Sequence, residues 1–264
     1  MNPVLNDNVM KNTAGVGPIV ITDDTMTVKG AVRKTVILLV MLLAGAAYTW
    51  KVYYDSINPS SVSIWMTCGI IGAFILAMII SFKPKTAPYL SPVYAVGEGF
   101  ALGGISAMLN DAFATKDAYG VVVANSNIVT NAVLITIVTT FVALFVYRSR
   151  IIKVNSTFTK VISIALISIL AFYLIGMLVS LFGGANSSFM QALYGNSLLS
   201  IGINAVIAVI AALSLLQDFH FIETGAAAGA PKYMEWYGAF GLMVTLVWLY
   251  LEVLRLLSKI QSRN

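Results

Sequence analysis

The segment NSLLSIGINAVIAVIAALSLLQDFHFIETG, from Asn196 to Gly225, determines the class of fold that we expect. An uncharged run from Asn196 to Gln217 leads directly into Asp218, His220 and Glu223. An α-helix rises ~1.5 Å per residue, so ~20 apolar residues cross the ~30 Å hydrocarbon layer of a membrane. The run predicts a transmembrane helix, and the acids at its end raise the question of what they contact.

The composition of the whole chain agrees with a membrane protein. The 264 residues are 59% hydrophobic and 10% charged, with a mean hydropathy of +0.87. Soluble domains have roughly 45–50% apolar and about 25% charged residues. The net charge of +5 does not indicate nucleic-acid binding, because the basic residues lie beside the apolar segments, where they orient membrane helices.

Seven segments are apolar and long enough to span a bilayer, and short connections join them into one bundle. We therefore predict an all-α, polytopic seven-helix protein with a flexible cytoplasmic tail over residues 1–34 and a transmembrane domain over residues 35–260. The only cysteine, Cys68, cannot form an internal disulfide or a thiolate metal site, and we expect no cofactor. The segments are Val36–Tyr54, Val62–Phe82, Pro88–Leu109, Ile128–Tyr147, Phe158–Phe182, Ser197–Gln217 and Tyr237–Leu257.

The distribution of Lys and Arg predicts a cytoplasmic N-terminus. Most basic residues then fall on the cytoplasmic side, but Arg255, Lys259 and Arg263 fall on the opposite side. Either the last helix places these cations outside, or it is shallow or re-entrant. In the third segment, Gly99 and Gly103 are four residues apart, and this spacing favours close helix packing.

Four acidic residues lie in or near apolar segments: Glu98, Asp218, Glu223 and Glu252. An ionised group at mid-membrane costs roughly 2.5–3.5 kcal/mol on insertion scales, so each must pair, face water or take up a proton. Glu252 could pair with Arg255 at i+3 and reach the interface. Asp218 could be only the first loop residue.

Glu98 and His220 each have two possible interpretations, one structural and one functional. Glu98 could be a buried acid bonded to Tyr94 or Ser106, or an acid that lines a cation path. His220 is the only histidine. Imidazole titrates near neutral pH, which would suit a sensor, but a solvated role at a loop edge is the stronger prediction.

Several motifs resemble the Bax-inhibitor-motif membrane proteins. They are DFHFIE at Asp218, WLYLEVLRLL around Glu252, SFKPK…EGFALGGIS from Ser81 to Ser106, and APKYMEWYGAFGLMVTLVWLYLEVLRLL. The resemblance spans about Thr27 to Ile260 and is closest to the bacterial branch. Asp218 and Glu223 match the family's motif near the end of helix six. Glu252 stands where the family has a second Asp in helix seven.

This resemblance implies a bundle with helix seven near its centre and a pH-dependent calcium leak. Asp218 and Glu252 would form a proton-sharing latch, because two adjacent carboxylates in a low dielectric do not both ionise cheaply. When both are ionised, their oxygens could hold Ca²⁺ transiently. Glu98, Glu223 and Arg255 would line the pore or support the pair. Lys83 and Lys85 are the nearest matches to a basic residue that engages the pair in relatives.

We therefore expect a pH-sensitive cation (Ca²⁺) leak channel or transporter in a bacterial cytoplasmic membrane. The alternative is a non-transporting membrane partner or regulator of a membrane protease. An intramembrane aspartyl protease is disfavoured, because its Gly-x-Gly-Asp motif is absent, so we expect no enzymatic activity. The expected partners are the lipid bilayer, calcium or another cation, protons and a membrane protein, but not nucleic acid.

Overall fold

A computed structural model describes residues 25–55, 61–116, 122–124, 126–182, 191, 195 and 197–263. Within these residues, 7 helices are long and apolar enough to cross a membrane, which confirms the predicted fold class. A 3₁₀ turn, η1 (Pro84–Thr86), precedes α4, and the strands β1 (Thr115–Lys116) and β2 (Val122–Ala124) form an antiparallel pair after it. The helices are α2 (Val28–Asp55), α3 (Ser61–Phe82), α4 (Ala87–Ala112), α5 (Ile128–Arg148), α6 (Ser156–Leu181), α8 (Leu198–Ala227) and α9 (Met234–Gln261).

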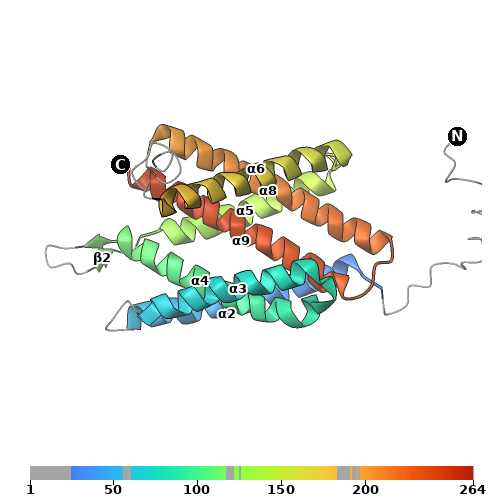
Figure 1. The fold of residues 1–264 in the computed structure, drawn as a ribbon, viewed down its shortest axis with the longest axis horizontal. Helices are drawn as coiled ribbons and strands as arrows, with labels where there is room; N and C mark the ends of the chain where they lie inside the picture. Colours follow the sequence, from blue (N-terminus) through green and yellow to red (C-terminus); the bar gives the residue numbers. More distant parts are fainter. Residues whose placement is uncertain are drawn as a thin grey trace, which may run out of the picture.

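Helix α9 lies between two groups of helices, as predicted for the seventh segment. Figure 1 shows α2, α3 and α4 on one side of it and α5, α6 and α8 on the other. One apolar cluster joins α9 to α5 and α8 and includes Leu249 and Leu254 of α9. A second cluster joins α9 to α2, α3 and α4 and includes Phe240 and Met243. Opposite faces of α9 therefore complete both cores.

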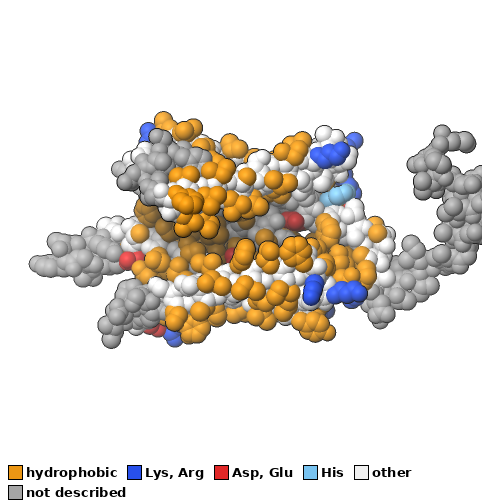
Figure 2. All heavy atoms as spheres, viewed as in Figure 1, with side chains coloured by type: hydrophobic (Ala, Val, Ile, Leu, Met, Phe, Trp, Pro, Cys, Tyr) orange, Lys and Arg blue, Asp and Glu red, His pale blue; other side chains and the backbone are white. Residues whose placement is uncertain are grey.

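The outer surface of the bundle is apolar. Large side chains are exposed on several helices, including Phe74 of α3 at 66%, Phe141 of α5 at 67% and Ile167 of α6 at 65%. Figure 2 shows hydrophobic side chains along the length of the bundle and Lys and Arg side chains near its ends. A soluble monomer rarely exposes apolar patches of this extent, so this surface faces lipid.

Several helix ends differ from the sequence prediction, and three of them bear on the charged residues. Helix α2 begins at Val28, so residues 28–34 of the predicted tail are helical, while residues 1–24 lie outside the described residues. Helix α8 continues to Ala227, ten residues past the predicted end, and α9 begins at Met234. Hydropathy ends a span at the first charged residues. Here the helices continue past those residues, and two of them, Lys34 and Glu223, are bound by side chains from other parts of the chain.

Helices α2 and α4 approach closely at the two glycines singled out in the sequence, which confirms their predicted packing role. A Cβ atom at Gly99 would lie 2.2 Å from the backbone oxygen of Leu42. A Cβ atom at Gly103 would lie 2.2 Å from the backbone oxygen of Ala46 and 2.2 Å from Oγ1 of Thr49. Both contacts involve the backbone of α2, which cannot yield as a flexible side chain can.

Replacement of Gly103 by alanine should therefore destabilise the bundle. We expect the free energy of unfolding to fall by about 1–3 kcal/mol, the usual cost of overpacking a core. The measurement is unfolding by SDS titration in detergent micelles. Gly202→Ala in α8 is the matched control, because no atom lies within 4 Å of the added Cβ atom. That control should be neutral or slightly stabilising, since Ala favours helix over Gly. Equal losses in both variants would contradict a close contact at Gly103.

Candidate functional site

Most of the described basic residues gather at one end of the bundle, which we call the basic end. It contains the start of α2, the α3–α4 turn, the α5–α6 turn and the α8–α9 turn. We call the opposite end, where α9 finishes, the far end. The basic residues at the basic end are Lys29, Arg33, Lys34, Lys83, Lys85, Arg148, Arg150, Lys153, Lys160 and Lys232.

Asp218 lies in a cleft between the two groups of helices, lined by residues nearer the basic end than the far end. The cleft has a volume of about 610 Å³ and is lined by residues from α3, from α6 and the turn before it, and from α8 and α9. Figure 2 shows a hollow between the groups with acidic side chains inside it. Polar groups contribute much of the lining: Ser81, Thr159, Gln217, Asp218, His220, Thr224, Tyr237 and Thr245.

The carboxyl group of Asp218 is not fully satisfied by the protein. Its Oδ2 atom is buried and has no hydrogen-bond partner in the described part of the chain. The side chain points at α9 near Gly241, where an added Cβ atom would lie 4.0 Å from Oδ1. Buried polar atoms without protein partners usually bind water or an ion. The sequence alternative, in which Asp218 is only a loop residue, is wrong, because α8 continues nine residues beyond it.

Glu252 lies in a separate polar network between α6, α8 and α9. Its Oε1 atom accepts hydrogen bonds from Tyr173 at 3.0 Å, Arg255 at 2.9 Å and the indole of Trp248 at 3.3 Å. Its Oε2 atom accepts one from the amide of Asn204 at 3.1 Å. The pairing with Arg255 that the i+3 spacing suggested is confirmed, but Glu252 is 1% exposed and does not reach the interface.

The structure does not bring Asp218 and Glu252 together, so the predicted contact between them is wrong. Asp218 faces α9 at Gly241 and Thr245, and Glu252 lies seven residues beyond Thr245 on that helix. Seven residues correspond to about 10 Å along a helix axis, too far for a shared proton. The sequence correctly placed the acids on adjacent helices but could not give their relative depth.

The other predicted residues have different settings. Lys83 and Lys85 are exposed at the α3–α4 turn, and within the described residues neither contacts Asp218 or Glu252, so their predicted engagement of the pair is wrong. Glu98 is partly buried on α4, one turn after Tyr94, whose ring packs edge-on against Phe240 of α9. The hydroxyl of Ser106, the other predicted partner of Glu98, instead lies 2.7 Å from that of Tyr250 on α9.

Glu223 belongs to a cluster at the surface of the basic end. Its carboxylate accepts hydrogen bonds from the hydroxyl of Tyr147 and, at 2.9 Å, from the guanidinium of Arg150. Nδ1 of His220 lies 3.4 Å from the same Tyr147 hydroxyl. These contacts connect the end of α8 to the α5–α6 turn. Glu223 is thus held beside the cleft that contains Asp218, since the next residue, Thr224, lines that cleft.

Two buried charged residues were missed by the sequence analysis. Glu235, in the first turn of α9, is 1% exposed and binds Lys34, Lys232 and Thr27. Lys259, read as a topology signal, is 4% exposed and donates to Ser200 and Asn204. Apart from Lys232, which is three residues from Glu235, their partners lie far away in sequence, so local patterns gave no signal for these contacts.

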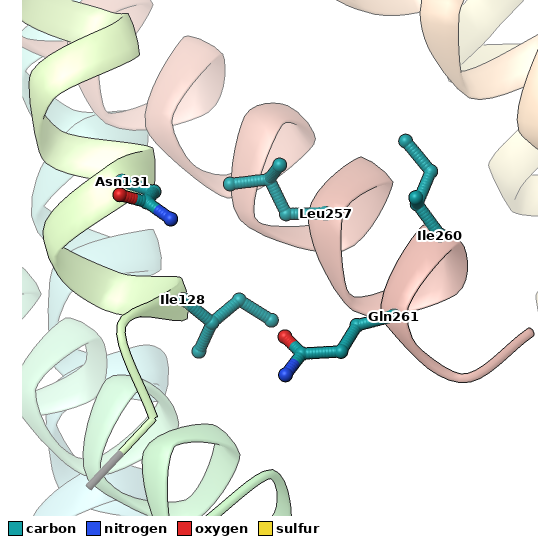
Figure 3. Close-up of a pocket in the computed structure, with 5 residues that line it drawn as sticks. All are labelled: Ile128, Asn131, Leu257, Ile260 and Gln261. Atoms are coloured by element: carbon teal, nitrogen blue, oxygen red, sulfur yellow. The ribbon is translucent and has the colours of Figure 1, made fainter. Parts of the chain in front are cut away.

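A second, smaller pocket lies at the far end between α5 and α9. Its volume is about 190 Å³. Figure 3 shows Asn131 of α5 and Leu257 and Gln261 of α9 beside the space between the helices, and Ile128 and Ile260 complete the lining. None of these five residues is titratable. The cleft at Asp218 is therefore the better candidate for a site that handles cations or protons.

The family assignment follows from comparison with known proteins. A family model described as Bax inhibitor 1 like matches residues 2–262. The chain belongs to this family. Comparison with curated proteins and with solved structures finds no match. As a member of the Bax inhibitor 1 like family with seven spanning helices, the chain is an integral membrane protein, consistent with a channel or transporter.

In this Bax inhibitor 1 like protein, the acids at membrane depth are arranged at two levels. Asp218 lies nine residues before the end of α8 at the basic end, which is about 14 Å along the helix. Glu252 lies nine residues before the end of α9 at the far end, again about 14 Å. In the described residues no group of three or more His, Cys, Asp and Glu side chains could hold a metal.

Proposed function

We propose that this Bax inhibitor 1 like protein is a pH-sensitive cation leak channel or transporter for Ca²⁺, with Asp218 as the acid that cations meet first. The single observation that carries the proposal is the buried Oδ2 of Asp218, which has no hydrogen-bond partner among the described residues, in a cleft of about 610 Å³ lined partly by polar side chains. A carboxylate in this setting attracts cations, and this electrostatic attraction is strong enough to control their entry. We propose no enzymatic activity.

Weak binding of Ca²⁺ at Asp218 would suit a leak channel or transporter. Ca²⁺ takes 6–8 oxygen ligands, and a tight site contains several carboxylates. Asp218 would supply one carboxylate, while nearby Thr159, Gln217 and Thr245 would supply neutral oxygens. The remaining ligands would be water. Such a site allows a cation to enter and also to leave, as conduction requires.

The gate in this proposal is an apolar layer between the cleft and the network around Glu252. Leu215 of α8 is 0% exposed and Leu249 of α9 is 1% exposed, and both belong to the core cluster between the two levels. Hydrated cations do not cross a dry apolar constriction, so this conformation corresponds to the closed state. Opening would require movement of α8 against α9.

Protonation of Asp218 would supply the pH dependence. The titratable side chains that line the cleft with it are His220 of α8 and Tyr237 of α9, and the described lining from α3 and α6 is not titratable. Loss of the negative charge would weaken cation binding and change the packing of α8 on α9. In this proposal Asp218 alone responds to pH. It does not share a proton with Glu252, because the two residues are too far apart.

We propose that the basic end is cytoplasmic and that the membrane is the bacterial cytoplasmic membrane. The basic residues near the C-terminus do not contradict this orientation, because two of them, Arg255 and Lys259, have partners inside the protein and so are weak indicators of topology. Lys259 is buried, and Arg255 pairs with Glu252. Since α9 is a full 28-residue helix, a shallow or re-entrant last segment is not needed to explain them.

The test is Ca²⁺ flux into liposomes that contain purified protein and an indicator dye, measured across pH. Asp218→Asn should reduce flux at least about tenfold and remove its pH dependence. A unit charge at about 4 Å is worth ~4 kcal/mol at an effective dielectric constant of 20, and tenfold corresponds to only about 1.4 kcal/mol. Asp55→Asn is the matched control, because that acid is exposed at the far end and should leave flux unchanged.

The outcomes separate the candidate functions. Flux that Asp218→Asn does not alter would refute the role of the cleft. No flux from the folded wild-type protein at any pH would favour the alternative, a non-transporting partner or regulator of a membrane protease. Crosslinking in cells would then be expected to capture a stoichiometric membrane protein.

A further inference from the structure

Four lysines flank the cleft that contains Asp218, on the side of the basic end. Lys83 is two residues from Ser81, and Lys160 directly follows Thr159, and both Ser81 and Thr159 line the cleft. Figure 2 shows Lys and Arg side chains on both groups of helices, near one end of the hollow between them. Positive charge is therefore present on both sides of the cleft. The four residues are Lys83 and Lys85 in the α3–α4 turn and Lys153 and Lys160 around the start of α6.

These four lysines have no partner in the described part of the chain. Their side chains are exposed, and none forms an ion pair or a hydrogen bond with the described residues. Other cations at the basic end are compensated: Lys34 and Lys232 pair with Glu235, and Arg150 pairs with Glu223. Membrane topology requires an excess of cations on one side of the membrane, but it does not require their placement around a cleft. This placement favours an anionic ligand.

The cleft beside these lysines extends to membrane depth and is partly apolar. Ala77, Phe221, Phe240 and Val244 contribute to its lining. Phe221 is 41% exposed and Val244 is 37% exposed, so a ligand in the cleft can contact both. Val244 lies ten residues after Met234, the first residue of α9, which is ~15 Å along the helix and about half of the ~30 Å hydrocarbon layer. Cations at one end, hydroxyl groups beside them and apolar side chains deeper in the membrane match the phosphate, glycerol and acyl chain of a phospholipid.

We propose that the cleft binds an anionic phospholipid of the surrounding membrane. Its phosphate would lie between the lysines of the two groups of helices, and one acyl chain would lie over Val244. An anionic lipid is favoured over a zwitterionic one, because lysines near the membrane surface attract lipids with a net negative charge. The acyl chain would displace water and cations from Asp218. This effect on flux rests on the proposed function, but the lipid site does not.

The test is photo-crosslinking in nanodiscs that contain phosphatidylcholine and a minor fraction of phosphatidylglycerol. A benzoylphenylalanine at Val244 should capture phosphatidylglycerol at least about fivefold more often than its share of the bulk lipid, a ratio that corresponds to about 1 kcal/mol. The same photoreactive group at Val209 of α8 is the matched control, because Val209 is 59% exposed outside the cleft and should capture lipids in bulk proportion. Mass spectrometry identifies the captured lipids. Capture of no lipid at Val244, or capture in bulk proportion, would overturn the inference.

Substitutions of exposed cations test the recognition of the headgroup. Lys83→Gln combined with Lys160→Gln should reduce the capture at Val244 to bulk proportion. Lys29→Gln combined with Arg33→Gln removes two exposed cations from α2, no described residue of which lines the cleft, and should leave the enrichment unchanged. Equal losses in the two double variants would indicate only a general attraction to an anionic surface and would overturn the inference. Soluble glycerol phosphate should not compete, and full competition would indicate a site for soluble phosphates instead.

Measurements of Ca²⁺ flux separate this inference from the proposed function. In liposomes that contain phosphatidylglycerol, the variant without Lys83 and Lys160 should conduct more Ca²⁺ than the variant without Lys29 and Arg33, because lipid no longer occupies its cleft. Enrichment of phosphatidylglycerol at Val244 without flux from any variant would retain the lipid site and refute the leak. Flux without enrichment would retain the leak and overturn the lipid site.

Discussion

Replacement of Glu235 by glutamine should lower the free energy of unfolding by about 3–5 kcal/mol, the usual cost of removing one partner from a buried ion pair. Oε1 of Glu235 accepts hydrogen bonds of 2.9 Å from both the amide and the hydroxyl of Thr27 and lies 3.2 Å from the ammonium of Lys232. Its Oε2 binds Lys34, whose side chain is only 15% exposed. Glutamine would place an amide donor against one of these cations. SDS-induced unfolding in bicelles would measure the loss.

The control for this prediction is the exposed ion pair at the far end. Asp55 and Lys51 are 65% and 79% exposed and 4.0 Å apart, so Asp55→Asn should cost less than about 1 kcal/mol. Combining Glu235→Gln with Lys34→Met should recover part of the loss, because no buried ammonium then remains without its carboxylate. Additive effects of the two substitutions would refute direct coupling between α2 and α9 at this point.

Replacement of Glu252 by glutamine should cost about 2–3 kcal/mol, because hydrogen bonds to a charged group are worth about 1.5–3 kcal/mol and a buried partner is left unpaired. The loss should be smaller than at Glu235, since the side chain of Arg255 is 34% exposed and water can solvate it. The same SDS titration would rank the two variants. A larger loss for Glu252→Gln than for Glu235→Gln would contradict this account.

A second comparison at Glu252 uses aspartate, the shorter acid. Glu252→Asp retains the charge but is one methylene shorter, so it should not reach Arg255 and Asn204 together. We expect Glu252→Asp to lower the free energy of unfolding by less than Glu252→Gln does. Substitution of Arg255 or Asn204 in addition should not restore the lost stability. If Glu252→Asp were as stable as the wild type, the hydrogen-bonded network described here would not require the length of glutamate.

Hydropathy was sufficient to predict seven spanning helices, because a bilayer demands about 20 apolar residues for each crossing. It failed at the helix ends where charge is compensated inside the protein. Lys34 lies in α2 because Glu235 binds it, and Glu223 lies in α8 because Tyr147 and Arg150 bind it. Each partner is distant in sequence, so no local pattern could extend these helices.

The sequence correctly identified the acids of the candidate site as unusual residues, but the predicted contact between Asp218 and Glu252 was wrong. Asp218 and Glu252 occupy adjacent helices, and only the depth of one helix relative to the other separates them. That depth is fixed by contacts such as the hydrogen bond from Asn204 to Glu252, which a single sequence does not reveal. The same limit explains why Lys259 resembled a topology signal until its contacts to Ser200 and Asn204 were seen.

The shared use of α9 by both apolar clusters has a consequence for biosynthesis. Domains of a nascent chain usually fold in order, beginning with the N-terminal part. Here neither cluster is complete without side chains of the last helix, such as Phe240 for one and Leu249 for the other. The six earlier spans must therefore wait in the membrane, inserted but incompletely packed, until the ribosome has released residues 234–261.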